Sequence, residues 1–281
     1  MSGVIDYWCN LFTPDGIRTC FIDQDELREV FEWWRMGDHL TGYPPREFLR
    51  LLDEAGVEMV LVPSSKMRSF RTQQLIWDVP VRTVAELREQ APDRIGGLYG
   101  INPWTRMDGV RELDDAVRRQ GFVGAHLHPY GFGLPLNDAA YYPFYAKCVE
   151  LDVPLVVQVG HSAESMPSAV GRPLLLDDVA LYFPELRIVA AHTGWPWVEE
   201  LIALAWKHRN VYIGTSAHAP KYWDPALVRF LSSRGMGKVL FGTDYPVLLH
   251  REALAQVDAL GLRDEPRSWL LRETANKVFK L

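Results

Sequence analysis

Short apolar segments rich in Val, Ile and Leu alternate along the whole chain with longer amphipathic segments. In the amphipathic segments, apolar residues recur at positions i, i+3 and i+4, which predicts helices packed on a sheet. Continuous apolar strands separated by helices are typical of a parallel sheet that is covered on its outer face. The predicted strands are residues 3–9, 57–62, 96–102, 122–128, 154–160, 186–192, 210–215 and 238–243.

Successive strand–helix units in a chain of 281 residues favour an α/β fold of the (β/α)8 TIM-barrel type, since such barrels have about 250 residues. We expect a single domain over residues 1–281, with an open, doubly wound sheet as the alternative. The first strand is not followed by G-x-G-x-x-G and no Walker lysine occurs, which weakens the nucleotide-binding versions of that alternative. Two connections are long, residues 10–44 and 63–82, and we predict that 10–44 is a lid or insert loop on the catalytic face.

Composition and charge exclude several classes of partner. The formal net charge is −6 and basic residues do not cluster, so we expect no nucleic-acid partner. No apolar run approaches the roughly 20 residues that span a bilayer, and the N-terminus lacks the pattern of a secretion signal. The three cysteines, Cys9, Cys20 and Cys148, have no metal-type spacing, which fits a reduced, cytoplasmic setting.

Polar residues terminate several of the predicted strands. The fourth strand ends in His126 and His128, the fifth runs into His161, the sixth ends in His192, and Asp244 follows the eighth. Burying such a side chain is costly unless it is paired or ligated. Each residue alone is explained by a hydrogen-bonded rim side chain. Because the carboxyl ends of barrel strands share one rim, the set together predicts a site for a small-molecule substrate.

Other residues near the same rim are candidates for binding this substrate. The basic residues of the second long connection suit a substrate carboxylate, although a solvated surface explains them about as well. A loop hydrogen bond is the alternative explanation for the histidine after the seventh strand. The predicted substrate contacts are Trp8, Asn10, Arg68, Arg71, Trp195, His218 and Tyr245. The histidines expected at the surface, in helices or loops, are His39, His208 and His250.

Four segments of the chain, VQVGHS, VAAHTGWPW, LFGTDYP and ETANKVFKL, occur in this order. Together they resemble the amidohydrolase superfamily, and more closely its branch related to aminocarboxymuconate-semialdehyde decarboxylase. The segment GAHLHPYGFG also resembles the Gly-x-Lys-x-His-Pro segment of many of these relatives. The resemblance covers essentially the whole chain. It implies that His161 is a metal ligand, that His192 is an acid/base or electrophilic partner, and that Asp244 is a ligand or general base.

The first predicted strand departs from the pattern of this family. The family carries His-x-His there, and both histidines bind the metal, whereas the corresponding residues here are Trp8 and Asn10. Tryptophan cannot ligate a metal, and an asparagine carbonyl is a poor zinc ligand. His161 and Asp244 alone are too few for a catalytic zinc site, which normally has three protein ligands.

Two alternatives follow from this departure. The i, i+2 pair on the fourth strand offers a displaced site for one divalent metal, with zinc as the expected ion. Its predicted ligands are His126, His128, His161 and Asp244. In the other alternative, catalysis is metal-free. There His161, His192 and Asp244 act as acid, base and carbonyl polariser, and Trp8 fills the vacated pocket and stacks on a planar substrate.

Three functions remain open from the sequence. The first is hydrolysis of a C–O or C–N bond in a lactone, ester or amide of a small carboxylated or aromatic compound. The second is non-oxidative decarboxylation of an aromatic or unsaturated acid, which the relatives perform with similar residues. The third is a non-catalytic barrel that binds a ligand. A homodimer is expected by analogy with similar barrels.

Overall fold

The structure is a computed structural model that describes residues 3–281, so residues 1 and 2 of the predicted domain lie outside it. A parallel sheet with the order β1-β2-β5-β6-β7-β8-β9-β10 forms its centre. These strands are β1 (Val4–Asp6), β2 (Val57–Pro63), β5 (Ile95–Gly100), β6 (Phe122–Leu127), β7 (Leu155–Val157), β8 (Ile188–Ala190), β9 (Val211–Gly214) and β10 (Val239–Leu240). Each falls at a predicted strand, so the predicted single-domain α/β barrel is confirmed.

The first and last strands meet where residues 7–10 lie beside residues 241–245, a contact that we call the closing seam. The Asp244 amide N–H donates to the Trp8 carbonyl oxygen at 2.9 Å, and the Asn10 amide N–H donates to the Tyr245 carbonyl oxygen at 3.0 Å. Cys9 and Tyr245 form a parallel bridge. The seam therefore lies directly beneath the predicted catalytic rim.

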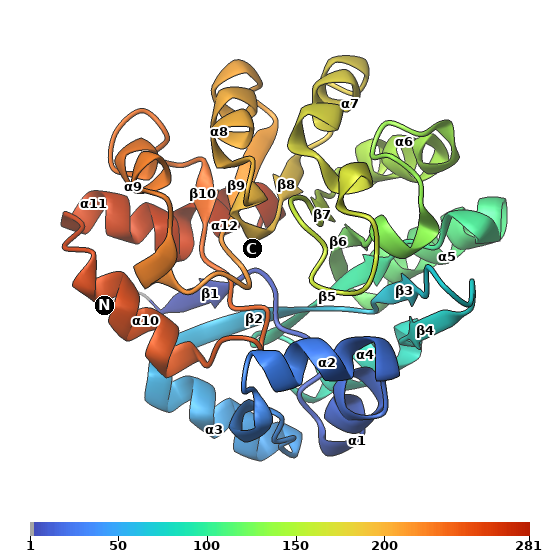
Figure 1. Cartoon of the computed structure of the whole chain (residues 1–281), viewed down its shortest axis with the longest axis horizontal. Helices are drawn as coiled ribbons and strands as arrows, with labels where there is room; N and C mark the ends of the chain where they lie inside the picture. Colours follow the sequence, from blue (N-terminus) through green and yellow to red (C-terminus); the bar gives the residue numbers. More distant parts are fainter. Residues whose placement is uncertain (1–2) are drawn as a thin grey trace.

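Helices surround the strands and cover the outer face of the sheet (Figure 1). Their buried apolar residues, such as Leu52 in the first of them and Leu113 in the third, pack against the strands. A helix packed on a sheet requires such an apolar stripe. In chain order they are α3 (Pro45–Ala55), α4 (Val81–Gln90), α5 (Arg106–Gln120), α6 (Tyr142–Glu150), α7 (Leu176–Tyr182), α8 (Val198–Lys207), α9 (Pro225–Leu231), α10 (His250–Ala259), α11 (Asp264–Ser268) and α12 (Thr274–Phe279).

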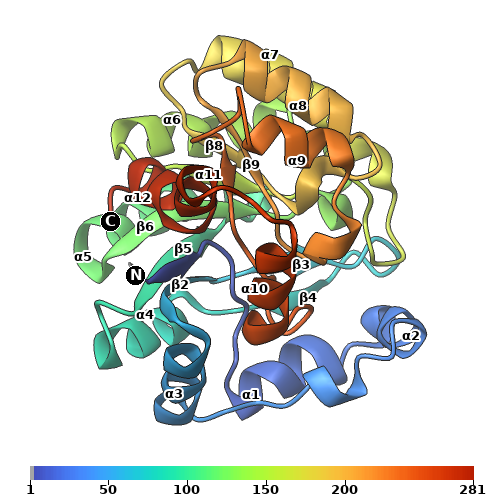
Figure 2. The same ribbon diagram turned by 90° about the vertical axis from the view of Figure 1, so that its left-hand side faces the viewer.

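The connection 10–44 is largely helical. It contains α1 (Pro14–Ile17), a π-helical turn over Arg18–Ile22 and α2 (Asp25–Trp33). Thr13 begins α1, because its hydroxyl oxygen accepts the Gly16 amide N–H at 3.1 Å, as an N-cap does. In Figure 2, α1 and α2 lie at the lower right, apart from most of the outer helices.

The second long connection contains an antiparallel hairpin of β3 (Lys66–Arg68) and β4 (Leu75–Asp78). The sequence did not predict this hairpin, because its strands are too short to show an alternating pattern. The indole N–H of Trp77 donates to the carbonyl oxygen of Cys20 and so ties the hairpin to the 10–44 connection. No helix within residues 3–281 has the length and apolar character needed to cross a membrane.

Candidate active site

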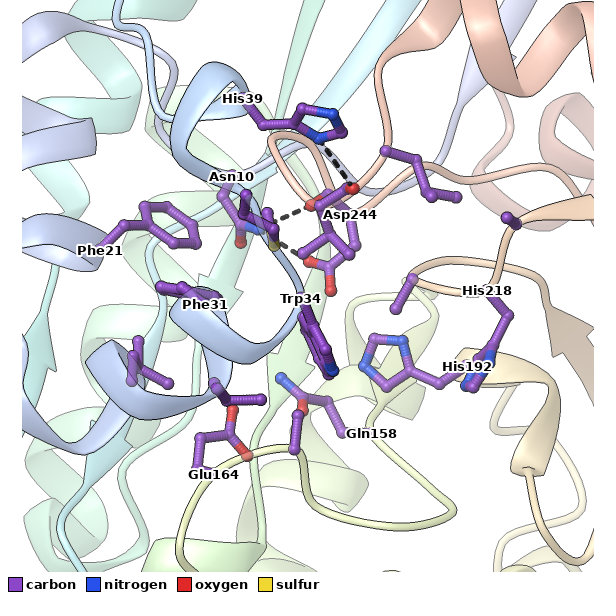
Figure 3. Close-up of a pocket in the computed structure, with 18 of the residues that line it drawn as sticks. Asn10, Phe21, Phe31, Trp34, His39, Gln158, Glu164, His192, His218 and Asp244 are labelled. Atoms are coloured by element: carbon purple, nitrogen blue, oxygen red, sulfur yellow. Dashed lines mark hydrogen bonds between the residues drawn. The ribbon is translucent and has the colours of Figure 1, made fainter.

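A cavity of about 730 Å³ lies at the carboxyl ends of the strands, the usual place for an active site in this fold. Its polar base comes from strand ends and the loops after them. These residues are Asn10, Gln158, His161, Glu164, His192, His218 and Asp244. An apolar and aromatic roof comes from the 10–44 connection, and its residues are Phe21, Leu27, Val30, Phe31, Trp34 and Met36. Figure 3 shows the Trp34 side chain projecting into the space between the polar groups.

The cavity gathers most of the residues that the sequence singled out. Those that line it are Trp8, Asn10, His161, His192, Trp195, His218 and Asp244. Five others do not line it: Arg68, Arg71, His126, His128 and Tyr245. All three predicted catalytic residues therefore face one space, whereas two of the four predicted metal ligands do not.

Asp244 belongs to a turn after β10 and has a positive φ of 56°, which is uncommon for a residue with a side chain. Burial raises the pKa of its carboxyl well above the usual value. The hydrogen bond from Asn10 lowers this pKa in part, while the negative charges of Glu164 and Asp6 raise it. Burial therefore favours the uncharged, protonated form of the Asp244 carboxyl.

Asn10 and Trp8 occupy the positions of the family's first-strand ligands and bond to each other. The Trp8 indole N–H donates to Asn10 Oδ1 at 3.0 Å. Asn10 Nδ2 donates to Asp244 Oδ1 at 2.7 Å and to the carbonyl oxygen of Tyr245 at 3.0 Å. Trp8 is 1% exposed and fills the interior of the barrel. The two residues thus form a hydrogen-bond chain that ends on the Asp244 carboxyl.

His192 lies between Trp8 and the loop after β9. Its ring centroid is 4.8 Å from that of Trp8, and its Nδ1 is 3.0 Å from Ser216 Oγ. Burial lowers the pKa of His192 to about 3, with a further contribution from the nearby His218. The imidazole is therefore neutral near pH 7 and can accept a proton.

His161 and His218 form a second imidazole pair on the cavity wall. Their ring centroids are 6.1 Å apart, and the Trp195 ring lies 4.8 Å from His161. His161 Nδ1 is 3.0 Å from the Ser162 carbonyl oxygen, to which only an N–H can donate. Burial lowers the pKa of His218 to about 4, and His161 adds to this effect.

Glu164 is a cavity residue that the sequence did not reveal. Its Oε2 accepts the Ser162 hydroxyl at 2.6 Å, and its Oε1 is 3.5 Å from His128 Nε2. Burial acts to raise the pKa of Glu164, but His128 and Ser162 outweigh burial and lower it to about 2. The cavity therefore holds two carboxyl groups whose pKa values are shifted in opposite directions, lowered at Glu164 and raised at Asp244. Two carboxyl groups with opposed pKa shifts are typical of acid–base sites.

His126 and His128 lie behind the cavity wall and are 1% and 2% exposed. Within residues 3–281, the ring nitrogens of His126 have no hydrogen-bond partner, while His128 Nε2 lies 3.5 Å from Glu164 Oε1. The His126 ring packs on the Trp8 indole at 4.5 Å between centroids. Burial lowers the pKa of His126 well below its usual value, as do the neighbouring His128 and His192. The pair is therefore packed among side chains instead of facing a substrate.

The donor set does not fit the metal that the family implies. Asn10 turns its amide N–H groups, not its oxygen, toward Asp244, and the Asn10 oxygen already accepts a hydrogen bond from Trp8 Nε1. Over the described range, 3–281, no group of three or more His, Cys, Asp and Glu side chains converges as metal ligands. The displaced site predicted around His126, His128, His161 and Asp244 is thus not assembled.

The predicted carboxylate contacts from the second long connection are also placed elsewhere. The Arg68 guanidinium lies 5.8 Å from the Trp104 ring centroid, and its Nε donates to the Gln73 carbonyl oxygen at 2.7 Å. Arg71 is exposed to solvent. The antiparallel hairpin directs both residues away from the cavity, which has no Lys or Arg among its described lining residues.

Of the three histidines predicted at the surface, two are buried and one, His39, is half-buried. His39 lines the cavity, and the buried His208 lies 2.6 Å from an Asp177 carboxylate oxygen. His250 Nε2 lies 2.9 Å from Asp6 Oδ2. Asp6 also accepts the Trp8 amide N–H at 2.9 Å and so supports the closing seam. The prediction was wrong because these residues lie on helices and loops that fold back onto the barrel.

Comparison with known proteins agrees with this arrangement. A model of the amidohydrolase family matches residues 5–281. The chain belongs to the amidohydrolase family. The resemblance of its strand-end motifs is therefore confirmed, and the chain is a member of an enzyme superfamily.

Curated relatives of this amidohydrolase include two enzymes. One is the 2-keto-4-carboxy-3-hexenedioate hydratase of Sphingobium sp., which is 28% identical over 198 residues. That match covers 62% of this chain and 54% of the hydratase, so it spans about half the length of that relative. The other is the gamma-resorcylate decarboxylase of Rhodococcus jostii, 23% identical, with 83% of this chain and 86% of the decarboxylase covered.

Among solved structures, this amidohydrolase shares its fold with 5-carboxyvanillate decarboxylase from Novosphingobium aromaticivorans. The TM-score is 0.75 at 18% identity, and 99% of this chain and 96% of that chain are covered. That decarboxylase was solved with manganese and 4-hydroxy-3-methoxy-5-nitrobenzoic acid. Manganese, and not the predicted zinc, is thus the metal named for this relative.

Proposed function

We propose that this amidohydrolase is a lyase that removes the carboxyl group of a small aromatic or unsaturated acid without oxidation. The observation that carries the proposal is the buried Asp244 carboxyl, which faces a cavity with an aromatic roof and whose raised pKa favours the protonated form. A decarboxylase needs a proton donor, because the carbon that loses CO2 must gain a proton. The decarboxylase activities named for two relatives support the same class.

In the proposed reaction the substrate lies flat beneath Trp34, with its carboxylate beside the imidazole pair of His161 and His218. The bond between the ring carbon and the carboxylate breaks, and its electron pair stays on the carbon. Asp244 transfers its proton to that carbon, CO2 leaves, and Asp244 takes a new proton from solvent. The described lining residues of the cavity include no Lys or Arg that could form an ion pair with the carboxylate, so its loss is favoured over its retention.

The 10–44 connection serves as the lid in this proposal. Its apolar side chains, including Phe31 and Trp34, cover the polar base of the cavity. They exclude water, which strengthens the interaction between the substrate and the Asp244 carboxyl.

The proposed reaction uses the chain's own side chains in place of a metal. Asn10 takes over the contact with Asp244 that a metal ion would make, since it holds the carboxyl at 2.7 Å through an N–H. Metal analysis of protein purified without added metal tests this step. We expect less than about 0.1 metal ion per chain, and activity that survives chelation. A stoichiometric metal that is essential for turnover would contradict it.

Hydrolysis of a lactone, ester or amide is the second candidate function. It is favoured by His192, whose pKa of about 3 leaves a neutral imidazole in the cavity that can accept a hydrogen bond from a water molecule. In that reaction the Asp244 acid would protonate the leaving group. A neutral substrate also suits a cavity whose described lining lacks Lys and Arg.

Product analysis separates the two candidates. Aromatic acids and their neutral lactones and esters are incubated with the protein in water enriched in oxygen-18. Release of CO2 and uptake of a solvent proton on carbon, without oxygen-18 in the product, is the expected result. Oxygen-18 in a product carboxylate would replace the proposed lyase reaction with hydrolysis. The inactive variant Asp244→Asn serves as the control for background reaction.

A further inference from the structure

The side chains of Tyr7 and Ser216 form a hydrogen-bonded chain that ends on His192. Tyr7 follows β1, is fully buried, and lies 2.5 Å through its hydroxyl from Ser216 Oγ. Ser216 Oγ is in turn 3.0 Å from His192 Nδ1. The chain crosses the interior of the barrel from the first strand to the loop after β9, and none of the predicted roles of the site accounts for it.

The Tyr7 ring occupies a slot that two glycines create. A Cβ atom at Gly214 would lie 2.1 Å from the Tyr7 hydroxyl oxygen, and a Cβ atom at Gly242 would lie 2.4 Å from Tyr7 Cε1. Real Cβ atoms do not approach other atoms so closely. The neighbouring strands therefore leave room for this phenol alone, and its hydroxyl has a fixed place beside Ser216.

The geometry at Ser216 decides which nitrogen of His192 carries the proton. His192 Nδ1 lies 3.3 Å from the Ser216 carbonyl oxygen, in addition to its contact with Ser216 Oγ. A carbonyl oxygen can only accept a hydrogen bond, so this longer contact favours a hydrogen on Nδ1, and the shorter contact with the Ser216 hydroxyl adds to it. The Ser216 hydroxyl oxygen then accepts a hydrogen bond from Nδ1, and the same hydroxyl makes a second hydrogen bond with the Tyr7 hydroxyl. In neutral imidazole the other nitrogen is left with a lone pair.

We propose that Tyr7 and Ser216 are positioning residues that fix His192 as the Nδ1–H tautomer, with the Nε2 lone pair available to the cavity. The inference rests on the second candidate function, hydrolysis, only in giving His192 a contact with the attacking water. Burial raises the pKa of Tyr7, so the phenol remains a neutral hydrogen-bond donor under all conditions of assay. The ring of Trp8 supports the opposite side of the imidazole, at 4.8 Å between centroids.

The tautomer is measured directly by long-range proton–nitrogen NMR of the ¹⁵N-labelled histidine rings, with the His192 signals assigned by their absence in His192→Gln. We expect a protonated Nδ1 and an unprotonated Nε2 in the wild type. In Ser216→Ala and Tyr7→Phe we expect a mixture of tautomers and a fall in kcat of about 10- to 100-fold, with little change in KM. Tyr145→Phe is the matched control, because its buried hydroxyl donates to the Leu136 carbonyl oxygen at 2.8 Å on the opposite, helical side.

Two results would overturn the inference. One is a wild-type His192 that is protonated on Nε2, and the other is an unchanged tautomer in both Ser216→Ala and Tyr7→Phe. The NMR result does not depend on which reaction the protein catalyses. If His192→Gln retained full turnover, the role of His192 in the hydrolysis candidate would fail, while the tautomer would still decide the inference about Tyr7 and Ser216.

Discussion

Substitution of Asn10 by alanine tests the hydrogen-bond chain that stands where the family's first-strand ligands would be. The change removes four hydrogen bonds: from the Trp8 indole N–H at 3.0 Å, to Asp244 Oδ1 at 2.7 Å, to the Asp244 carbonyl oxygen at 3.4 Å and to the Tyr245 carbonyl oxygen at 3.0 Å. A buried polar group left without a partner costs about 1–3 kcal/mol. The buried Trp8 N–H loses its partner, whereas the Tyr245 carbonyl keeps the hydrogen bond from the residue 10 amide N–H, so we expect Asn10→Ala to lower the free energy of unfolding by about 1–3 kcal/mol.

The same substitution should move the pH dependence of turnover. The Asn10 hydrogen bond favours the ionised form of Asp244 and so lowers a pKa that burial has raised. Without this hydrogen bond the pKa of Asp244 rises further. The proposed reaction needs the protonated acid, and we therefore expect the alkaline limb of the kcat profile to move to higher pH in Asn10→Ala.

Urea denaturation followed by tryptophan fluorescence measures the loss of stability, and a pH–rate profile measures the shift. Asn137→Ala is a matched control, because Asn137 Nδ2 also donates to a carboxylate, Asp178 Oδ2, at 2.8 Å, but on the exposed surface. Its expected cost is below about 0.5 kcal/mol. A cost for Asn10→Ala as small as that of the control, or an alkaline limb that moves to lower pH, would refute the reasoning.

Three further predictions concern the same cavity. Asp244→Asn should abolish turnover and leave the fold intact. Because the pKa of Asp244 is raised in the folded state, the wild type loses stability as pH rises through that pKa, whereas the variant does not. The difference in unfolding free energy between variant and wild type should therefore grow by up to about 1.4 kcal/mol per pH unit in this range, and a pH-independent difference would contradict this. The pKa of His192 falls from 6.5 to about 3 on folding, so its contribution to stability is present above pH 6.5 and is lost toward pH 3. Between these pH values the unfolding free energy should fall less steeply with decreasing pH in His192→Gln than in the wild type. Equal slopes in the two proteins would count against the buried neutral imidazole. The double variant Trp8→His with Asn10→His should bind manganese in a calorimetric titration, whereas the wild type should not; failure of the double variant to bind would show that these two positions are not what separates this chain from its manganese-containing relative.

The sequence predicts the barrel and the main site residues because both follow from a geometric rule. Apolar strands alternating with amphipathic helices form a parallel barrel, and residues at the ends of its strands must share one rim. His161, His192 and Asp244 were found in this way, and all three line the cavity.

Residues on the loops could not be placed by the same rule. Glu164 follows His161 by three positions, but only the folded loop shows that its carboxylate faces the cavity. Arg68 and Arg71 were expected there, yet the antiparallel hairpin takes them elsewhere. His250 lies in α10, where its partner Asp6 is 244 positions distant, and such a contact has no local signature in the chain.

The closing seam has a consequence for how activity arises during synthesis. Trp8 and Asn10 leave the ribosome early, whereas Asp244, with which Asn10 bonds at 2.7 Å, leaves it late. A nascent chain that has already paired β1 with its neighbours lacks the proton donor until the last strand arrives. The proposed catalytic site is therefore complete only when the barrel closes, and a chain stalled before closure cannot act on its substrate.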